Sequence, residues 1–144
     1  MNTKFTYHID GTIPNKGTVF VFGSNLAGKH GAGAAYVAAK SFGAIYGQGV
    51  GYMEKSVDKR SYAIPTKDKT IHTLPLEAIQ LHINNFLKFA YDHPELQFFV
   101  TRIGCGLAGY KDYQIAPLFI NAPENCSFAE KWRSDIKYLY TFHG

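Results

Sequence analysis

Residues 98–110 read Phe-Phe-Val-Thr-Arg-Ile-Gly-Cys-Gly-Leu-Ala-Gly-Tyr, an apolar run that passes directly into a glycine-rich segment. The apolar run is typical of a buried strand, which we expect over residues 98–103. Glycines at its end allow backbone conformations that other residues avoid, and they let backbone N–H groups approach an anion closely. The segment therefore predicts a buried strand followed by a loop that faces a phosphate group.

Another glycine-rich segment, the first glycine-rich loop in chain order, occupies residues 23–33 and reads Gly-Ser-Asn-Leu-Ala-Gly-Lys-His-Gly-Ala-Gly. The glycine-rich end of residues 98–110 is accordingly the second glycine-rich loop. It follows the apolar run 19–22, which predicts another buried strand, and it precedes the helix-forming residues 34–40. In open α/β sheets, ligands bind beyond the carboxyl ends of the strands, so two loops at such ends can bracket one crevice. We therefore expect the two glycine-rich loops to share a ligand.

Strand and helix patterns alternate along the rest of the chain. The strongest helix pattern runs from a candidate cap at Thr73 to His93, with apolar residues three or four positions apart. We also expect a helix over 34–40 ended by Gly43, a turn or bent strand over 46–51, a strand over 61–64 stopped by Pro65, a short helix over 113–119 and a strand over 138–142. This alternation predicts an α/β fold in a single domain, residues 1–144.

The composition fits one globular domain. Of 144 residues, 46% are hydrophobic and 15% are aromatic, which is ample for a core. No apolar run approaches the ~20 residues of a membrane span, and residues 1–8 lack the apolar centre of a signal peptide. We expect a cytoplasmic protein with no membrane partner.

Cysteine and histidine usage bears on metal binding. Cys105 and Cys126 are too few for a disulfide scaffold and lack the paired spacing of a zinc site. The six histidines are scattered, without the close spacing to cysteines or carboxylates that a metal site needs. We predict no metal and no cofactor, and we expect Cys105 to pack as a small thiol because no catalytic signature surrounds it.

Four segments together resemble a known family. They are Asn25 after a strand, His-Gly-Ala-Gly-Ala-Ala at 30–35, Ser-Tyr-Ala-Ile-Pro-Thr-Lys at 61–67 and Thr-Arg-Ile-Gly-Cys-Gly-Leu at 101–107. In this order they resemble the macro domain, an ADP-ribose-binding module, over most of the chain. The last segment is similar to the signature of the macro branch that removes ADP-ribose from carboxylate side chains or nucleobases, with Thr101 in place of a proline. The chain also resembles a macro-related group often encoded by phages.

The resemblance implies a three-layer α/β/α domain with a mixed central sheet and a diphosphate between the two glycine-rich loops. It places Asn25 near the distal ribose and Asp10 near the adenine amino group, although Asp10-Gly11 also fits a plain turn between strands. The implied ligand-binding residues are Asp10, Asn25, Gly31, Ala32, Gly33, Gly104, Cys105, Gly106, Leu107, Ala108, Gly109 and Tyr110. Phe128, Tyr140 and Phe142 are candidates to stack on adenine or to fill the core.

Catalysis is where the chain departs from the deglycosylating branch. The resemblance implies a lysine that engages the anomeric carbon, for which Lys67 is the candidate, and an aspartate after the signature leucine, where this chain has Ala108. Lys67 could act as a nucleophile only if burial lowered its pKa, because the amine must be neutral to attack. The other interpretation is that Lys67 is a charged, solvated side chain. His30 is a second candidate, because it would face the crevice and can exchange protons near neutral pH. Its other interpretation is a loop histidine that only contacts phosphate or packs. A possible ADP-ribosyl hydrolase is the expected enzyme class.

The expected partner is ADP-ribose or a related NAD-derived nucleotide, free or attached to protein or nucleic acid. The net charge of +4 also permits a nucleic-acid-binding module, in which spread basic residues track a phosphate backbone. The candidate residues for that role are Lys29, Lys67, Lys69, Arg102 and Lys111. A third alternative is an interaction domain that has kept the fold without the ligand.

Overall fold

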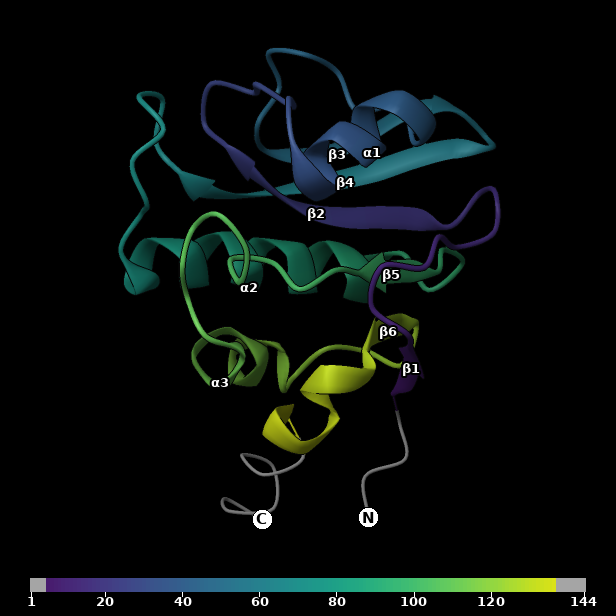
Figure 1. The fold of residues 1–144 in the computed structure, drawn as a ribbon. Helices are drawn as coiled ribbons and strands as arrows, with labels where there is room; N and C mark the ends of the chain where they lie inside the picture. The colour runs from purple at the N-terminus through teal and green to yellow at the C-terminus, as the bar shows by residue number, and fades with distance from the viewer. Residues whose placement is uncertain (1–4, 137–144) are drawn as a thin grey trace.

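A mixed sheet forms the centre of the computed structural model, which describes residues 5–136 (Figure 1). Within these residues the sheet has six strands, in the order β1-β6-β5-β2-β4-β3. The strands are β1 (Thr6–His8), β2 (Val19–Asn25), β3 (Gly51–Ser56), β4 (Lys59–Lys67), β5 (Phe98–Val100) and β6 (Cys126–Ala129). The helices are α1 (Gly33–Ser41), α2 (Leu76–Asp92), α3 (Asp112–Ile115) and the 3-10 turns η1 (Ala116–Phe119) and η2 (Glu130–Trp132).

Strand β2 lies between β4 and β5 and pairs with both in parallel. β5 also pairs in parallel with β6, and β6 with β1, whereas β3 runs antiparallel to β4 at one edge. The carboxyl ends of the five parallel strands therefore lie side by side, along the same end of the sheet. Loops that leave these strand ends are brought together whatever their distance in the sequence.

Both faces of β2 are buried, and its alternating side chains divide the core in two. Phe20 and Phe22 pack with α1 residues such as Ala38, whereas Val19 and Val21 belong to the larger cluster that includes α2 and η1. The sheet thus lies between α1 and the group formed by α2 and η1, as three layers (Figure 1). The expected α/β fold with a mixed central sheet and helices on both faces is confirmed.

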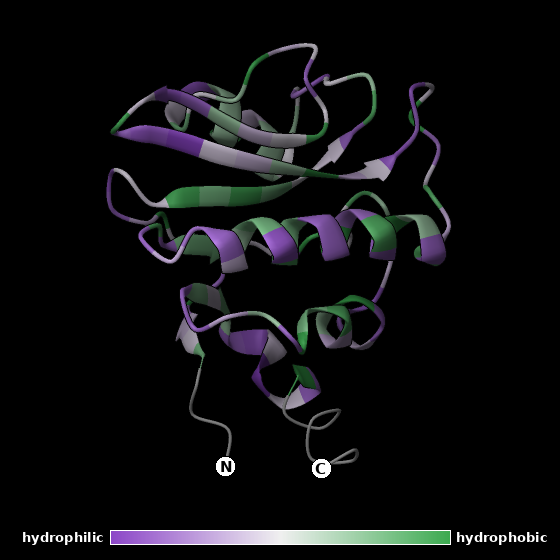
Figure 2. Ribbon diagram, turned by 180° about the vertical axis from the view of Figure 1, so that it is seen from behind, coloured by the Kyte–Doolittle hydropathy of each residue, from purple (hydrophilic) through white to green (hydrophobic). Residues whose placement is uncertain are grey.

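The two main helices follow the expected patterns. Helix α2 buries Ile79, Ile83, Phe86 and Ala90, which lie on one face, and its turns alternate between hydrophobic and hydrophilic in Figure 2. Helix α1 covers the expected 34–40, and Gly43 follows its end with φ of +72°, a left-handed conformation that suits glycine. In the part of the chain that is described, no helix is both long and apolar enough to cross a membrane.

Several expected boundaries are wrong. Strand β4 continues through Pro65 to Lys67. Its pairing with β3 stops at Ala63, so the β3 side of β4 is open at position 65, and a proline, which has no N–H to donate, is tolerated there. Strand β5 ends at Val100 rather than at residue 103. Beyond it, the Thr101 hydroxyl donates to the Val21 carbonyl, and the Ile103 N–H donates to the Thr101 carbonyl.

Other differences concern caps and short strands. The cap of α2 is Pro75 rather than Thr73, whose hydroxyl is bonded elsewhere. Strands β1 and β6 lie where the sequence predicts no strand, and β3 begins at Gly51, the last residue of the expected turn or bent strand. The strand expected over 138–142, with Tyr140 and Phe142, lies outside the described residues.

Residues 45–49 pack directly against the first glycine-rich loop, with no room for a side chain on Gly28 or Gly49. A Cβ atom on Gly49 would overlap the Asn25 carbonyl oxygen, and the Ser24 hydroxyl donates to the Gly49 carbonyl. Gly28 has φ of +72°, and its carbonyl accepts from Gly47 N–H at 2.9 Å. The shape of the first loop therefore depends on the absence of side chains where the two segments meet.

We predict that Gly49→Ala lowers the free energy of unfolding by about 2 kcal/mol, because the added methyl group forces two backbone segments apart. Urea denaturation followed by circular dichroism measures the change. Gly31→Ala is the matched control, since nothing lies within 4 Å of its added Cβ, and it should change the stability by less than about 0.5 kcal/mol. Equal stabilities of the two variants would contradict the close packing.

Candidate functional site

The two glycine-rich loops line one cleft of about 730 Å³ at the carboxyl ends of the parallel strands. This volume lies within the range of small-molecule sites. Of the expected ligand-binding residues, those that line the cleft are Asp10, Asn25, Gly31, Ala32, Gly33, Gly104, Cys105, Gly106, Leu107 and Ala108. The cleft therefore brings together residues up to about a hundred positions apart in the sequence, as expected for loops at neighbouring strand ends.

Helix α1 points its first turn into this cleft. Ala32, in an extended conformation, is the N-cap residue, no side chain caps the helix, and its first turn holds no acidic residue. Gly31, Ala32, Gly33 and Ala34 all line the cleft. Because the first N–H groups of a helix lack partners inside it, they attract an anion that the small residues allow to come close.

Asn25 and Lys67 are neighbours at the ends of β2 and β4. The Asn25 side chain accepts a hydrogen bond from Lys29 N–H and donates one to the Lys29 carbonyl, both at 2.9 Å. These bonds close the turn that opens the first glycine-rich loop. Asn25 thus shapes the loop, and one amide N–H and one oxygen lone pair remain for a ligand.

Lys29 and Lys67 both line the cleft. Among the ion pairs of residues 5–136, neither lysine has an acidic partner. Two unpaired ammonium groups and a helix N-terminus give this part of the cleft a positive potential, which favours an anionic ligand.

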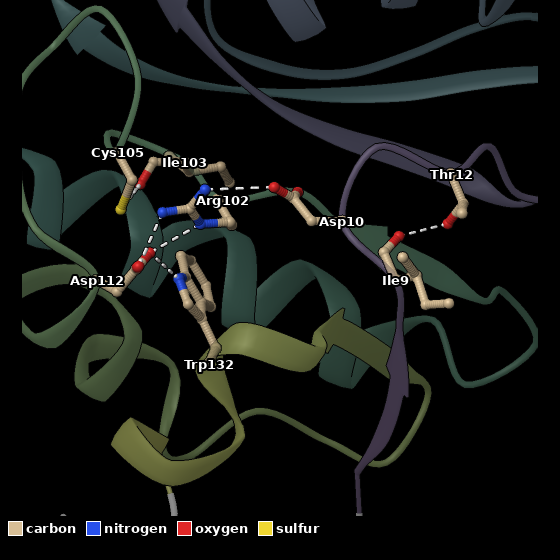
Figure 3. Close-up of polar contacts among 8 residues, drawn as sticks. All are labelled: Ile9, Asp10, Thr12, Arg102, Ile103, Cys105, Asp112 and Trp132. Atoms are coloured by element: carbon tan, nitrogen blue, oxygen red, sulfur yellow. Dashed lines mark hydrogen bonds and ion pairs between the residues drawn. The ribbon is translucent and has the colours of Figure 1, made fainter.

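Arg102 behaves differently, because aspartates hold its guanidinium (Figure 3). It donates to both carboxylate oxygens of Asp112, at 2.9 and 2.8 Å, and to Asp10 at 3.3 Å. The fully buried Trp132 indole N–H also donates to Asp112, at 2.7 Å. The network fastens the second glycine-rich loop to α3, to η2 and to the loop after β1.

The charges of the network shift the pKa values of its members. Hydrogen bonds to Asp112 raise the pKa of Arg102 further above its usual value. Burial would raise the pKa of Asp112, but the hydrogen bonds from Arg102 and Trp132 outweigh it and hold that pKa below its usual value. Burial, with a contribution from Asp112, raises the pKa of the Cys105 thiol to about 12, so this thiol is protonated at neutral pH.

An aromatic surface that sequence reasoning missed also lines the cleft. The His8 ring stacks on Phe99 with ring centres 3.7 Å apart, and Phe99 stacks on Phe20 at 5.9 Å. His8 Nδ1 lies 2.8 Å from the Ser127 hydroxyl, and burial lowers the pKa of this histidine.

The cleft extends across most of the sheet. His8 ends β1 and Lys67 ends β4, and these strands are four positions apart in the sheet. At the usual ~4.8 Å between neighbouring strands, the two residues are roughly 19 Å apart.

The expectation that His30 faces the cleft is wrong. His30 is buried, with 5% of its surface exposed, and is not part of the cleft lining. Its Nε2 lies 3.0 Å from the carbonyl oxygens of Ile45 and Gln48, and its ring packs edge-on against Phe22. His30 therefore holds residues 45–48 against the first glycine-rich loop.

Three further expected ligand contacts lie elsewhere. Gly109 and Tyr110 are not part of the cleft lining, and the Tyr110 hydroxyl donates to the Leu74 carbonyl at 2.6 Å. Phe128 is fully buried in the core against Phe119 and Trp132, so it cannot stack on a ligand. By contrast, Lys67 lines the cleft as expected.

We predict that Asp112→Ala lowers the free energy of unfolding at pH 7 by about 1–3 kcal/mol, because it leaves the buried Trp132 N–H without its acceptor and removes two of the three hydrogen bonds of the Arg102 guanidinium. Asp92→Ala, which removes the exposed pair with Lys88, is the control and should cost less than about 1 kcal/mol.

The same variant has an expected pH dependence. The pKa of Asp112 is lowered in the folded state, so its contribution is complete above its unfolded pKa of about 3.9 and is lost as the pH falls through the folded value. The stability difference between wild type and Asp112→Ala should therefore shrink below about pH 4. Denaturant titrations at several pH values measure it, and a difference that stays constant down to pH 2 would contradict the assignment.

Comparison with known proteins adds information on the fold. No protein-family model matches the chain, and no curated protein is similar to it. Among solved structures, the chain is similar to a protein of unknown function from Bacteroides thetaiotaomicron, with a TM-score of 0.63 and 17% sequence identity over 89% of this chain and 99% of that one. At this identity the likeness extends to the fold alone.

Proposed function

We propose that the protein is a macro-like domain that binds ADP-ribose or a related NAD-derived nucleotide in the cleft described above. The observation that carries the proposal is that both glycine-rich loops and the uncapped start of α1 line one cleft of about 730 Å³. Backbone N–H groups of such segments hold phosphate groups without a metal or a cofactor. The diphosphate of the ligand lies between residues 31–33 and residues 104–107.

The distribution of charge supports this orientation. Lys29 and Lys67 lie at the β2 and β4 ends of the cleft, beside the α1 start, and both are free of acidic partners among the described residues. The Arg102 charge is already balanced by Asp10 and Asp112. The electrostatic stabilisation of a phosphate group is therefore greatest near Lys29 and the start of α1, where no acidic side chain balances the positive charge.

The β1 side of the cleft suits an adenine ring. His8 and Phe99 offer stacked ring surfaces, and Asp10 accepts from Arg102 through one oxygen and keeps the other for an amino group. Because His8 and Lys67 end strands four positions apart, a ligand that reaches both must be about the length of a dinucleotide. AMP alone would fill part of the cleft.

Binding is the activity that the site supports best, and hydrolysis of an ADP-ribosyl linkage is a separate proposal for Lys67. Among the described residues, Asp10 is the one carboxylate that lines the cleft, and it pairs with Arg102 rather than with Lys67. Ala108 occupies the position at which the resemblance implies an aspartate. Release of ADP-ribose from modified protein or nucleic acid, compared between wild type and Lys67→Ala, tests turnover.

We predict that Ala32→Glu lowers the affinity for ADP-ribose at least about tenfold, because its carboxylate competes with the diphosphate for the α1 N–H groups. Isothermal titration calorimetry measures the affinity. Ala32→Gln is the matched control, because it adds the same bulk without the charge; it reports the steric effect alone and should bind ADP-ribose more tightly than Ala32→Glu. The thermal stability of Ala32→Glu should equal or exceed that of wild type, since a carboxylate is favourable at a helix N-terminus.

The same titration separates the proposal from its alternatives. Equal affinities of Ala32→Glu and Ala32→Gln would contradict an anion at the α1 start. Absence of saturable ADP-ribose binding by wild type, together with salt-dependent binding of single-stranded nucleic acid, would establish the nucleic-acid alternative instead. Absence of both would leave an interaction domain.

A further inference from the structure

Ile71 has an unusual backbone conformation for its residue type. Among residues 5–136 it is the one residue other than glycine with a positive φ, at +67°. A β-branched side chain is especially unfavourable in this left-handed region, which glycine and asparagine occupy far more readily. Such outliers persist where the surrounding structure enforces them, and they concentrate at ligand-binding sites.

The hydrogen bonds of the loop enforce this conformation without using the Ile71 side chain. The Asp68 carboxylate accepts from the N–H groups of Thr70 at 2.9 Å and His72 at 3.0 Å, and Ile71 N–H donates to the Asp68 carbonyl at 3.1 Å. Asp68 N–H donates in turn to the His72 carbonyl at 2.8 Å. Glycine at position 71 would make the same bonds with less strain, so the turn itself does not require isoleucine.

The Ile71 side chain lines the cleft and is 41% exposed. Leu107, on the second glycine-rich loop, also lines the cleft and is 78% exposed. The two loops are fastened together, because the Thr73 hydroxyl donates to the Ala108 carbonyl at 3.1 Å and the Tyr110 hydroxyl donates to the Leu74 carbonyl at 2.6 Å. Two aliphatic side chains are thus held at the cleft beside the end of β4, where Lys67 lies.

We propose that Ile71, together with Leu107, is a specificity-determining residue that contacts the apolar face of a sugar ring at the end of the ligand next to Lys67. This assignment rests on the proposed function and names the ligand class that the site selects. A sugar buries carbon-bound hydrogens against these two aliphatic side chains, whereas the side chains themselves offer a phosphate no hydrogen bond. Ile71 and Leu107 therefore add affinity for a nucleoside diphosphate that carries a terminal sugar and add none for one that ends in phosphate.

The test compares ADP-ribose and ADP by isothermal titration calorimetry on wild type and Ile71→Gly. We expect Ile71→Gly to bind ADP-ribose about fivefold to tenfold more weakly, as for the loss of one or two buried methylene groups, and to bind ADP within about twofold of wild type. Its melting temperature should be unchanged or higher, because glycine relieves the left-handed strain. A role in stability alone would lower the melting temperature and leave the affinities unchanged.

Val57→Gly is the matched control, because Val57 is also aliphatic, exposed and in a turn, but lies outside the cleft lining. It should leave both affinities unchanged. Ile71→Asn, which tolerates the left-handed conformation and removes the apolar surface, should reproduce the selective loss even if the glycine variant folds poorly.

Unchanged affinities, or equal losses for ADP-ribose and ADP, would overturn the role of Ile71 while the proposed function stands. Wild type that binds neither ligand would overturn the proposed function and, with it, this assignment.

Discussion

The parallel pairing of β2 with both β4 and β5 is the constraint on which the site depends. Three loops leave the sheet at the carboxyl ends of these strands: the first glycine-rich loop, the turn that holds Ile71, and the second glycine-rich loop. Each loop contributes few buried apolar groups of its own. Their common position comes from ladder hydrogen bonds and from the alternating side chains of β2, which are buried on both faces of the sheet.

Side chains around the cleft are used mainly to hold the backbone in place. Asn25 closes its own turn, His30 bonds to the carbonyls of residues 45 and 48, and Thr73 joins two loops. Arg102 fastens the second glycine-rich loop through Asp112, which is itself bonded to the buried Trp132. Fixing these loops before a ligand arrives lowers the entropy cost of binding. The surface left for the ligand combines small residues of the two glycine-rich loops with the rings of His8 and Phe99 and the side chains of Lys29 and Lys67.

The sequence predicts those parts of the fold whose pattern is long or chemically distinctive. The periodic apolar residues of α2, the run that forms β2 and the two glycine-rich loops all lie where expected. Strands β1 and β6, with three and four residues, are too short for a pattern of alternation to be recognised. Arg102 and Asp10 are 92 residues apart, so their contact depends on the completed sheet. The direction of the His30 ring likewise depends on residues 45–48, which spacing within the first loop does not reveal.

Two features at the cleft run against what stability alone would select. Ile71 occupies a left-handed conformation, and Lys29 and Lys67 have no acidic partners among the described residues. The left-handed strain costs about 1–2 kcal/mol, against a total stability of about 5–15 kcal/mol. Elsewhere the apolar pattern and the fold agree, as in β2 and on the buried face of α2. Because departures from local rules concentrate where function requires them, the position of both features at one cleft supports a ligand site there.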